Sequence, residues 1–339
     1  MSLLEVLIAM FVLSIGLLGV AALIPVGRFA IVETGKSDRS GACGRAALSE
    51  IKVRRMLEYG YWSNPTPAQN NQAFAIDPLG VIREMPTNLG GATGNVAAVI
   101  PRITLKSSPT GPAMTFEQAD RIFTWHDDLE FSLPEDIKPP PPGESKRPRA
   151  NLGVSGLPDI AGSYSWLVTV TPAAAEAGLA VADRTLFSVS VVVCYRRDFS
   201  PDESTPPLPN GEHTAQVTFL GGGYGGGSVR LASPRIDPPL RLRENEWVML
   251  CGQVSGRTVC KWYRVVSADS GSPTTMVSLL GPDWDPSEDA NRNGKLDPGE
   301  DTNGNGVLDG VLATAVAIDH VVGVYTTTVE LDRNLLWNK

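Results

Sequence analysis

The first 27 residues, MSLLEVLIAMFVLSIGLLGVAALIPVG (residues 1–27), form an apolar stretch that contains a single charged side chain, Glu5. No residue from 6 to 27 is charged, and a helix of this length, rising about 1.5 Å per residue, matches the hydrocarbon thickness of a bilayer. A carboxylate at the centre of a bilayer costs about 2.5–3.5 kcal/mol, and less towards either face. The stretch therefore predicts a membrane-spanning helix whose one acid needs compensation.

The charges around Glu5 limit what can compensate it. A secretory signal peptide or a conventional anchor usually has Lys or Arg before its apolar segment, but no basic residue precedes Glu5. The nearest positive charge is the α-amine of Met1, about one helical turn away. We therefore expect the amine of the same or a neighbouring chain to pair with Glu5. The alternative is an ordinary anchor that places Glu5 among the headgroups.

Residues 1–9, MSLLEVLIA, resemble the mature N-terminus of type IV pilins and pseudopilins, which begins with a methylated Phe or Met and has glutamate at its fifth position. In that family a prepilin peptidase cuts after a glycine and methylates the new amine. The resemblance implies that Glu5 of one subunit neutralises the amine of Met1 on its neighbour, as the helix leaves the inner membrane and joins a filament core. The basic leader and its glycine are absent, so we expect the numbering to be that of the mature form. The resemblance covers only this N-terminal segment.

A helical pattern continues beyond the apolar stretch, because residues 27–58 contain no proline. Glu50 and Arg54 are spaced for an ion pair in the favourable order. We expect one helix over residues 1–60, with residues 1–27 in the membrane or filament core and residues 28–60 amphipathic. One half of its helical wheel collects these residues: Ala42, Cys43, Ala46, Ala47, Ile51, Val53 and Leu57.

Pro25 interrupts the pattern of this helix. Proline in a helix interior removes a hydrogen bond and clashes with the preceding turn, so we expect a kink or a locally unwound segment there. Pilins in filaments show similar melting before a proline near this position. The residues that the resemblance assigns to assembly are therefore Met1, Glu5 and Pro25.

Residues 61–339 contain short runs with the composition of β-strands, separated by Gly and Pro residues. We expect an α+β fold: a long protruding N-terminal α-helix with a mostly antiparallel β-sheet globular head. Residues 116–129 fit either a short helix or irregular structure. The expected strands are residues 164–171, 186–196, 216–220, 228–232, 246–250, 259–267, 275–280 and 313–331, the last in two pieces.

Two segments of low complexity are expected to be loops. Residues 138–148 contain four consecutive prolines and are typical of an exposed polyproline linker. Residues 221–227, GGGYGGG, lack the Lys-Ser/Thr of a phosphate-binding loop. We expect a flexible hairpin tip there.

A β-hairpin is expected around a turn at residues 255–256. Counting outward from that turn, Val254 faces Arg257 and Cys251 faces Cys260, the latter in a non-hydrogen-bonded position where Cα atoms approach to about 4.5 Å. This spacing is compatible with a disulfide, and we predict one between Cys251 and Cys260. The alternative is two reduced, buried thiols. Cys43 and Cys194 are left over, and whether they bond to each other stays open.

Residues 289–300 match the pattern of a calcium loop. Ca²⁺ takes six to eight oxygens, which a 12-residue loop supplies from positions 1, 3, 5, 7, 9 and 12, with glycine at position 6. Gly294 stands at that position, and a second copy begins at once but has Leu312 at its twelfth position. The predicted ligands are Asp289, Asn291, Asn293, the Lys295 carbonyl, Asp297 and Glu300 in the first loop, and Asp301, Asn303, Asn305, the Val307 carbonyl and Asp309 in the second.

The flanks of these loops, at residues 289–312, differ from those of an EF-hand. Pro282, Pro286 and Pro298 lie before or within the first loop, and no room exists for a helix between the two copies. The segment resembles the helix-less tandem loops of dockerins and thrombospondin type-3 repeats. We expect calcium to tie down an acidic loop that otherwise repels itself; the alternative is a solvated turn without metal.

Composition limits the class of protein. The chain of 339 residues is 42% hydrophobic, with a net charge of −8 and a pI near 5.0, which argues against nucleic acid as a constitutive partner. None of its four cysteines forms a Cys-x-x-Cys pair, and its three histidines, His126, His213 and His320, have no ligand spacing. No constellation of residues suggests catalysis, so we expect no enzyme.

These observations favour a structural subunit of an extracellular type IV pilus-like filament. Its expected partners are further copies of the chain, the inner membrane before assembly, the prepilin peptidase and the assembly machinery, and its expected final location is the cell surface. Two alternatives remain open within the family: a pseudopilin of type II secretion and a minor pilin. An alternative of another class is a monomeric, membrane-anchored calcium-binding surface protein.

Overall fold

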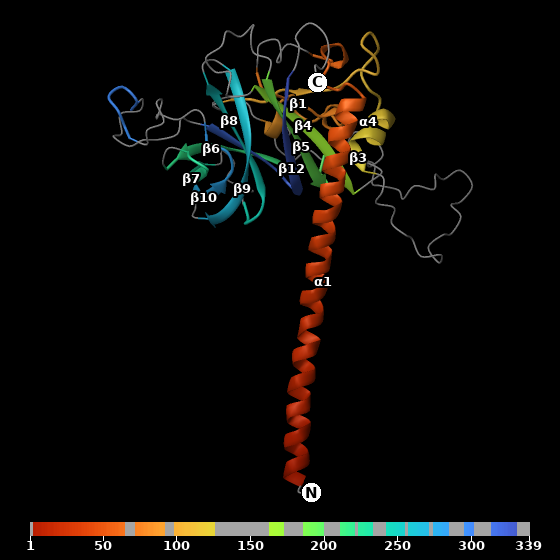
Figure 1. Ribbon diagram of the computed structural model, residues 1–339, viewed down its shortest axis with the longest axis vertical. Coiled ribbons are helices and arrows are strands. Elements are labelled where there is room, and N and C mark those ends of the chain that lie inside the picture. Colours follow the sequence, from red (N-terminus) through yellow and green to blue (C-terminus); the bar gives the residue numbers. More distant parts are fainter. Residues whose placement is uncertain are drawn as a thin grey trace, which may run out of the picture. The chain divides into compact units, whose positions relative to one another are not determined.

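A computed structural model gives the fold of the chain (Figure 1). The chain divides into two compact units, residues 1–42 and residues 43–339. Each unit is described by itself. The structure describes residues 3–64, 72–91, 98–125, 163–172, 186–199, 211–220, 223–232, 242–254, 257–270, 274–284, 295–301 and 313–330.

The N-terminal helix α1 extends over Leu3–Val53 and continues through Pro25. An unwound segment at Pro25 is therefore wrong for the single chain, whereas a kink there stays a prediction. Proline removes one backbone hydrogen bond, while the bonds of the turns on either side keep the segment helical. The predicted pair between Arg54 and Glu50 is confirmed as a short contact between Nε and Oε2.

The helix ends at Val53, seven residues before the expected end at residue 60. Arg55 takes a left-handed φ of +53°, and the Met56 N–H donates to the Ile51 carbonyl at 3.1 Å. This reversed hydrogen bond is typical of a helix C-terminus. The chain then enters a 3₁₀ turn, η1, over Tyr59–Tyr61.

A mixed six-stranded sheet forms one part of the second unit, in the order β12-β5-β4-β1-β2, with β3 paired to β4. All its pairs are antiparallel except β1 with β2. Its strands are β1 (Phe74–Ile76), β2 (Arg102–Ile103), β3 (Thr124–Trp125), β4 (Tyr164–Pro172), β5 (Leu186–Tyr195) and β12 (Val321–Glu330).

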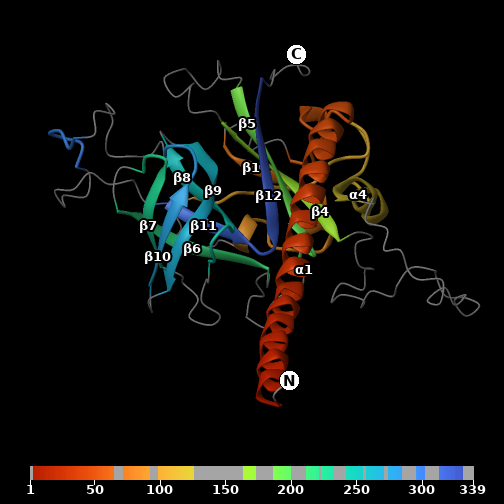
Figure 2. The ribbon, with the colours of Figure 1, turned by 60° about the horizontal axis from the view of Figure 1, so that its bottom comes forward.

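A closed six-stranded barrel forms the other part, in the order β10-β7-β6-β11-β8-β9 (Figure 2). Every pair in the barrel is antiparallel. Its strands are β6 (Glu212–Phe219), β7 (Gly226–Ala232), β8 (Trp247–Val254), β9 (Arg257–Ser270), β10 (Thr274–Leu280) and β11 (Ala313–Ile318).

The expected strands are confirmed, with shifted ends, and so is the mostly antiparallel pairing. Residues 313–331 do split into two strands, and the turn at Asp319 and His320 passes the chain from β11 in the barrel to β12 in the sheet. The expectation did not divide these strands, and the structure places six of them in a sheet and six in a closed barrel.

Three apolar clusters hold the second unit together. The first lies between the end of α1 and one face of the sheet, and includes Cys43, Ile51 and Trp166. The second fills the barrel. The third lies between sheet and barrel and includes Leu167, the neighbour of Trp166 on β4. Successive side chains of a strand point to opposite faces, so β4 supplies both clusters and is buried along its length.

The apolar face predicted for the second half of the helix is confirmed in part. Cys43, Ala47, Ile51 and Leu57 are buried, but Val53 is 80% exposed because the helix ends there.

Short elements complete the second unit: α3 (Pro78–Ile82), η2 (Leu89–Gly91) and α4 (Phe116–Phe123). The sequence of residues 116–129 fits either a short helix or irregular structure, and the helix α4 shows that residues 116–123 are helical. Thr115 caps it, since its hydroxyl accepts from the Gln118 N–H while the Gln118 side chain accepts from the Thr115 N–H. The polyproline segment 138–148 and the turn at 255–256 lie outside the described residues.

Candidate functional site

The apolar stretch of α1 is exposed in the single chain. A window of 18 residues within the helix has a mean hydropathy of 2.7, and none of it is buried. The helix is long and apolar enough to cross a membrane. The large exposed apolar side chains of its first 27 residues are Leu3, Leu4, Val6, Leu7, Ile8, Met10, Phe11, Val12, Leu13, Ile15, Leu17, Leu18, Leu23 and Ile24.

Glu5 lies in the first turn of α1 and is exposed. The positive end of the helix dipole favours a carboxylate at this place. No ion pair joins Glu5 to another residue that the structure describes. Met1 lies outside the described residues, so its pairing with Glu5 stays a prediction.

The predicted calcium ligands are described only between residues 295 and 301. Asp297 and Glu300 share one turn there: the Asp297 N–H donates to Glu300 Oε2 at 2.9 Å, and the Glu300 N–H donates to the Asp297 carbonyl at 3.1 Å. Among the described residues, no three His, Cys, Asp or Glu side chains gather as a metal site. Lys295 and Asp301 are also described; Asp289, Asn291, Asn293, Asn303, Asn305, Val307 and Asp309 lie outside.

Carboxylate, amide and carbonyl oxygens are the donors that calcium takes in proteins. The turn brings Asp297 and Glu300, the ninth and twelfth positions of the first loop, next to each other. These residue types are donors that calcium takes, but the contacts in the turn run through the Asp297 backbone, so calcium binding at both loops stays a prediction.

The acidic segment, residues 283–309, begins shortly after the end of the barrel strand β10, and its first two residues are held by contacts with the barrel. The Gly225 N–H donates to Asp283 Oδ1 at 2.8 Å, and the Lys261 ammonium donates to the Asp283 carbonyl at 2.7 Å. The next residue, Trp284, is 2% exposed and stacks on Phe219 with 5.5 Å between ring centroids. The segment thus begins with an indole ring packed into the barrel core.

Residues 221–227, of which 223–227 are described, join the antiparallel strands β6 and β7, so the expected hairpin is confirmed and its flexibility stays a prediction. A Cβ on Gly223 would lie 2.8 Å from the Trp284 Cβ, and one on Gly226 would lie 2.7 Å from the Leu279 carbonyl oxygen. Both glycines also have positive φ, +72° and +97°, which L side chains rarely adopt. The glycines here permit close packing against residues 279–284.

The cysteine register predicted for the β8–β9 hairpin is confirmed. Cys251 is opposite Cys260, and Val254 is opposite Arg257. Both cysteines are free thiols and buried; burial raises the pKa of Cys260 to about 12 and that of Cys251 well above its usual value. The pairing permits the disulfide, and the bond itself stays a prediction.

Cys43 and Cys194 lie on opposite sides of the sheet. Cys43 belongs to the cluster beneath α1 and Cys194 to the cluster between sheet and barrel. Both are free thiols, and burial raises the pKa of each to about 12. The sheet therefore separates the two thiols, which argues against a bond between them.

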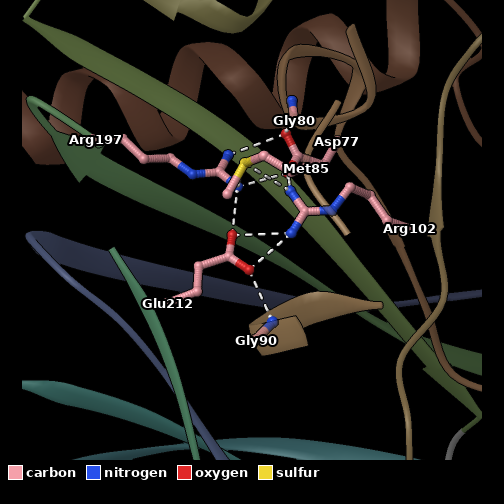
Figure 3. Close-up of polar contacts among 7 residues, drawn as sticks. All are labelled: Asp77, Gly80, Met85, Gly90, Arg102, Arg197 and Glu212. Carbon is pink, nitrogen blue, oxygen red and sulfur yellow. Dashed lines mark hydrogen bonds and ion pairs between the residues drawn. The ribbon is translucent and has the colours of Figure 1, made fainter. Parts of the chain in front are cut away.

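A cluster of four buried charges joins the sheet to the barrel, and sequence reasoning missed it (Figure 3). Arg197 binds Asp77 through two hydrogen bonds, of 3.0 and 2.6 Å. Arg102 binds Glu212 through two more, of 3.0 and 2.7 Å. Arg197 also reaches Glu212 at 2.9 Å, and Arg102 contacts Asp77. Each of these side chains is at most 1% exposed.

Backbone groups complete the cluster. The Gly80 N–H donates to Asp77 at 3.0 Å, and the Gly90 N–H donates to Glu212 at 2.8 Å. Asp77 follows β1 and caps α3, whereas Glu212 opens β6 of the barrel. The carboxylates therefore fix one element from each part of the second unit.

Burial alone would raise the pKa of Asp77, but the charges of Arg197 and Arg102 lower it to about 2. Burial opposes ionisation of Glu212 too, and the charges of Arg102 and Arg197 still lower its pKa. Both carboxylates are therefore ionised at neutral pH, and they face two guanidinium groups. Because each carboxylate is enclosed by its partners, the arrangement serves structure.

Comparisons with protein-family models, curated proteins and solved structures find no significant match for this chain.

Proposed function

We propose that this chain is a structural subunit of a filament of the type IV pilus kind. In this proposal residues 1–27 hold the subunit in the inner membrane until the assembly machinery adds it to the filament, and the β-rich unit forms the outer surface. The observation that carries the proposal is the exposed apolar surface of α1 with one acid in its first turn.

The energetics of that surface support assembly. Burying one large apolar side chain contributes about 1.5–3 kcal/mol, and fourteen such side chains between Leu3 and Ile24 are exposed in the single chain. Together they give tens of kcal/mol in favour of leaving water, so the helix requires either a bilayer or a packed core of identical helices. The filament supplies the second environment.

Glu5 distinguishes the two environments. In a simple anchor a carboxylate in the first turn gains only the attraction of the helix dipole, and a bilayer penalises it. In a core of parallel helices, the α-amine of a neighbour offset along the axis compensates the charge. A pseudopilin or a minor pilin would use the same contact, whereas the monomeric anchored surface protein would not.

Calcium belongs to the same proposal. Metal bound at Asp289, Asn291, Asn293, Asp297, Glu300 and the Lys295 carbonyl would neutralise part of the acidic segment outside the cell. The segment starts from the packed Trp284, so ordering it would extend the rigid surface of the barrel.

The test replaces Glu5 with Ala in the full chain, expressed together with a peptidase and an assembly system. We expect wild-type filaments by electron microscopy and N-terminal peptides bearing one methyl group by mass spectrometry. Glu5→Ala should enter the membrane normally but yield few or no filaments. Glu33→Ala is the matched control, because Glu33 is an exposed acid of the same helix, and it should assemble normally. Normal filaments from Glu5→Ala would refute the proposal.

A further inference from the structure

A groove of about 370 Å³ lies beside the C-terminal end of α1. Its apolar lining includes Leu105, Met114 and Ile122, and its basic lining consists of Arg54, Arg55 and Lys106. Among the described residues, none that lines it is acidic. The groove thus combines an apolar floor with a positively charged rim.

Arg55 stands where glycine would be favoured. Its φ of +53° is left-handed, and helices commonly place glycine at this position because a Cβ is unfavourable there. Its side chain is 61% exposed, so the arginine gains no burial in return. A strained residue on the rim of a groove points to a role other than stability.

The three basic residues of the rim are only partly neutralised by neighbouring acids. Arg54 pairs with Glu50, and Arg55 Nη1 lies 3.9 Å from Glu58 Oε2, the length of a weak pair. Lys106 forms no ion pair with any residue that the structure describes. An anionic ligand would meet this ammonium without displacing a partner.

We propose that this groove binds the acidic segment, residues 283–309, of a second copy of the chain. The proposal rests on the proposed function, since a filament places copies side by side. Leu296, Val307 and Leu308 stand among the acids and suit the apolar floor. The segment carries eight carboxylates against Arg292 and Lys295: Asp283, Asp285, Glu288, Asp289, Asp297, Glu300, Asp301 and Asp309.

Charge explains why the contact would be needed. The chain has a net charge of −8, so adjacent copies repel each other unless their basic surface meets their acidic surface.

The first test is zero-length cross-linking of Lys106 by a carbodiimide in filaments built from an equal mixture of ¹⁴N- and ¹⁵N-labelled full chains, at one fixed calcium concentration. We expect peptides that join Lys106 to a carboxylate of residues 283–309, with one label on each side. Mixed-label filaments without this cross-link, or with it only inside single chains, overturn the groove contact alone. Wild-type chains that form no filaments overturn the proposed function and this proposal with it.

Two variants separate binding from folding. Arg55→Gly relieves the left-handed strain, so its melting temperature should be equal to or above that of the wild type, while the mixed-label yield falls by about fivefold. Lys106→Glu should lower the yield by at least as much, and adding Asp285→Lys with Glu288→Lys should restore it. Arg230→Glu, an exposed reversal on the barrel, is the matched control. An unchanged yield in both groove variants overturns the proposal.

Discussion

Glu212→Gln tests the buried cluster most directly, since it removes one charge and keeps the shape of the side chain. Glu212 accepts hydrogen bonds from Arg102, Arg197 and the Gly90 N–H. A glutamine amide offers one acceptor oxygen and turns two donors towards these donors. The cluster would then carry a net buried charge of +1.

Breaking a buried ion pair from one side costs about 3–5 kcal/mol, and the enclosed position of Glu212, which is 0% exposed, places this site in that range. We expect a loss of that size in the free energy of unfolding of the full chain in detergent. Urea titration followed by tryptophan fluorescence measures it. All seven tryptophans lie after residue 60, so the signal reports the β-rich unit.

Glu117→Gln is the matched control. Glu117 is an exposed acid in the first turn of α4, so its replacement should change the free energy by less than about 0.5 kcal/mol. A double variant, Arg102→Leu with Glu212→Leu, restores neutrality, so it should lose less than Glu212→Gln. A cost below about 1 kcal/mol for Glu212→Gln, or a larger loss in the double variant, would refute the structural role of the cluster.

The same cluster predicts how stability depends on pH. The pKa of Asp77 is lowered to about 2 in the folded chain, against an ordinary value near 4. Its contribution, about 2 kcal/mol, is complete above pH 4 and disappears as the pH falls towards 2. Urea titrations at several pH values in that window should show this decline, and stability that is flat between about pH 4 and 2 would contradict it.

Three further predictions concern the barrel and its loops. Calcium at a hundredfold excess over its dissociation constant should raise the free energy of unfolding by about 2.7 kcal/mol relative to chelator, and Glu300→Gln should abolish that gain in the urea assay. The purified, oxidised chain should weigh two hydrogens less than the reduced chain by intact mass spectrometry, and Cys251→Ser, but not Cys43→Ser, should remove the difference. Gly226→Ala should cost about 2 kcal/mol by thermal melting, because its Cβ would meet the Leu279 carbonyl, whereas Gly225→Ala, which meets nothing, should cost about 1 kcal/mol.

The strands were predictable from sequence because β-branched and aromatic residues alternate along them. Their assignment to a sheet and a barrel was not, since it depends on pairs such as β1 with β4, which come from distant parts of the chain. The strands β1 and β2 are too short, at three and two residues, to show a period.

The candidate functional site also has features that the sequence predicts and features that it does not. The apolar helix and Glu5 are local features, so the sequence shows them directly. The buried cluster joins Asp77 to Arg197 across 120 residues, and Arg197 stands in an ordinary polar stretch after a strand. No spacing rule finds such a pair, because its members meet only after the sheet and the barrel have formed.

The turn between β11 and β12 has a mechanical consequence. Only Asp319 and His320 separate a barrel strand from a sheet strand, and both are tied down: the Asp319 N–H donates to the Gly211 carbonyl at 2.8 Å, and the His320 carbonyl accepts from the Tyr195 N–H at 2.9 Å. No flexible linker therefore joins β11 to β12. A pull applied to the barrel would therefore reach the sheet undiminished instead of being absorbed by an uncoiling linker.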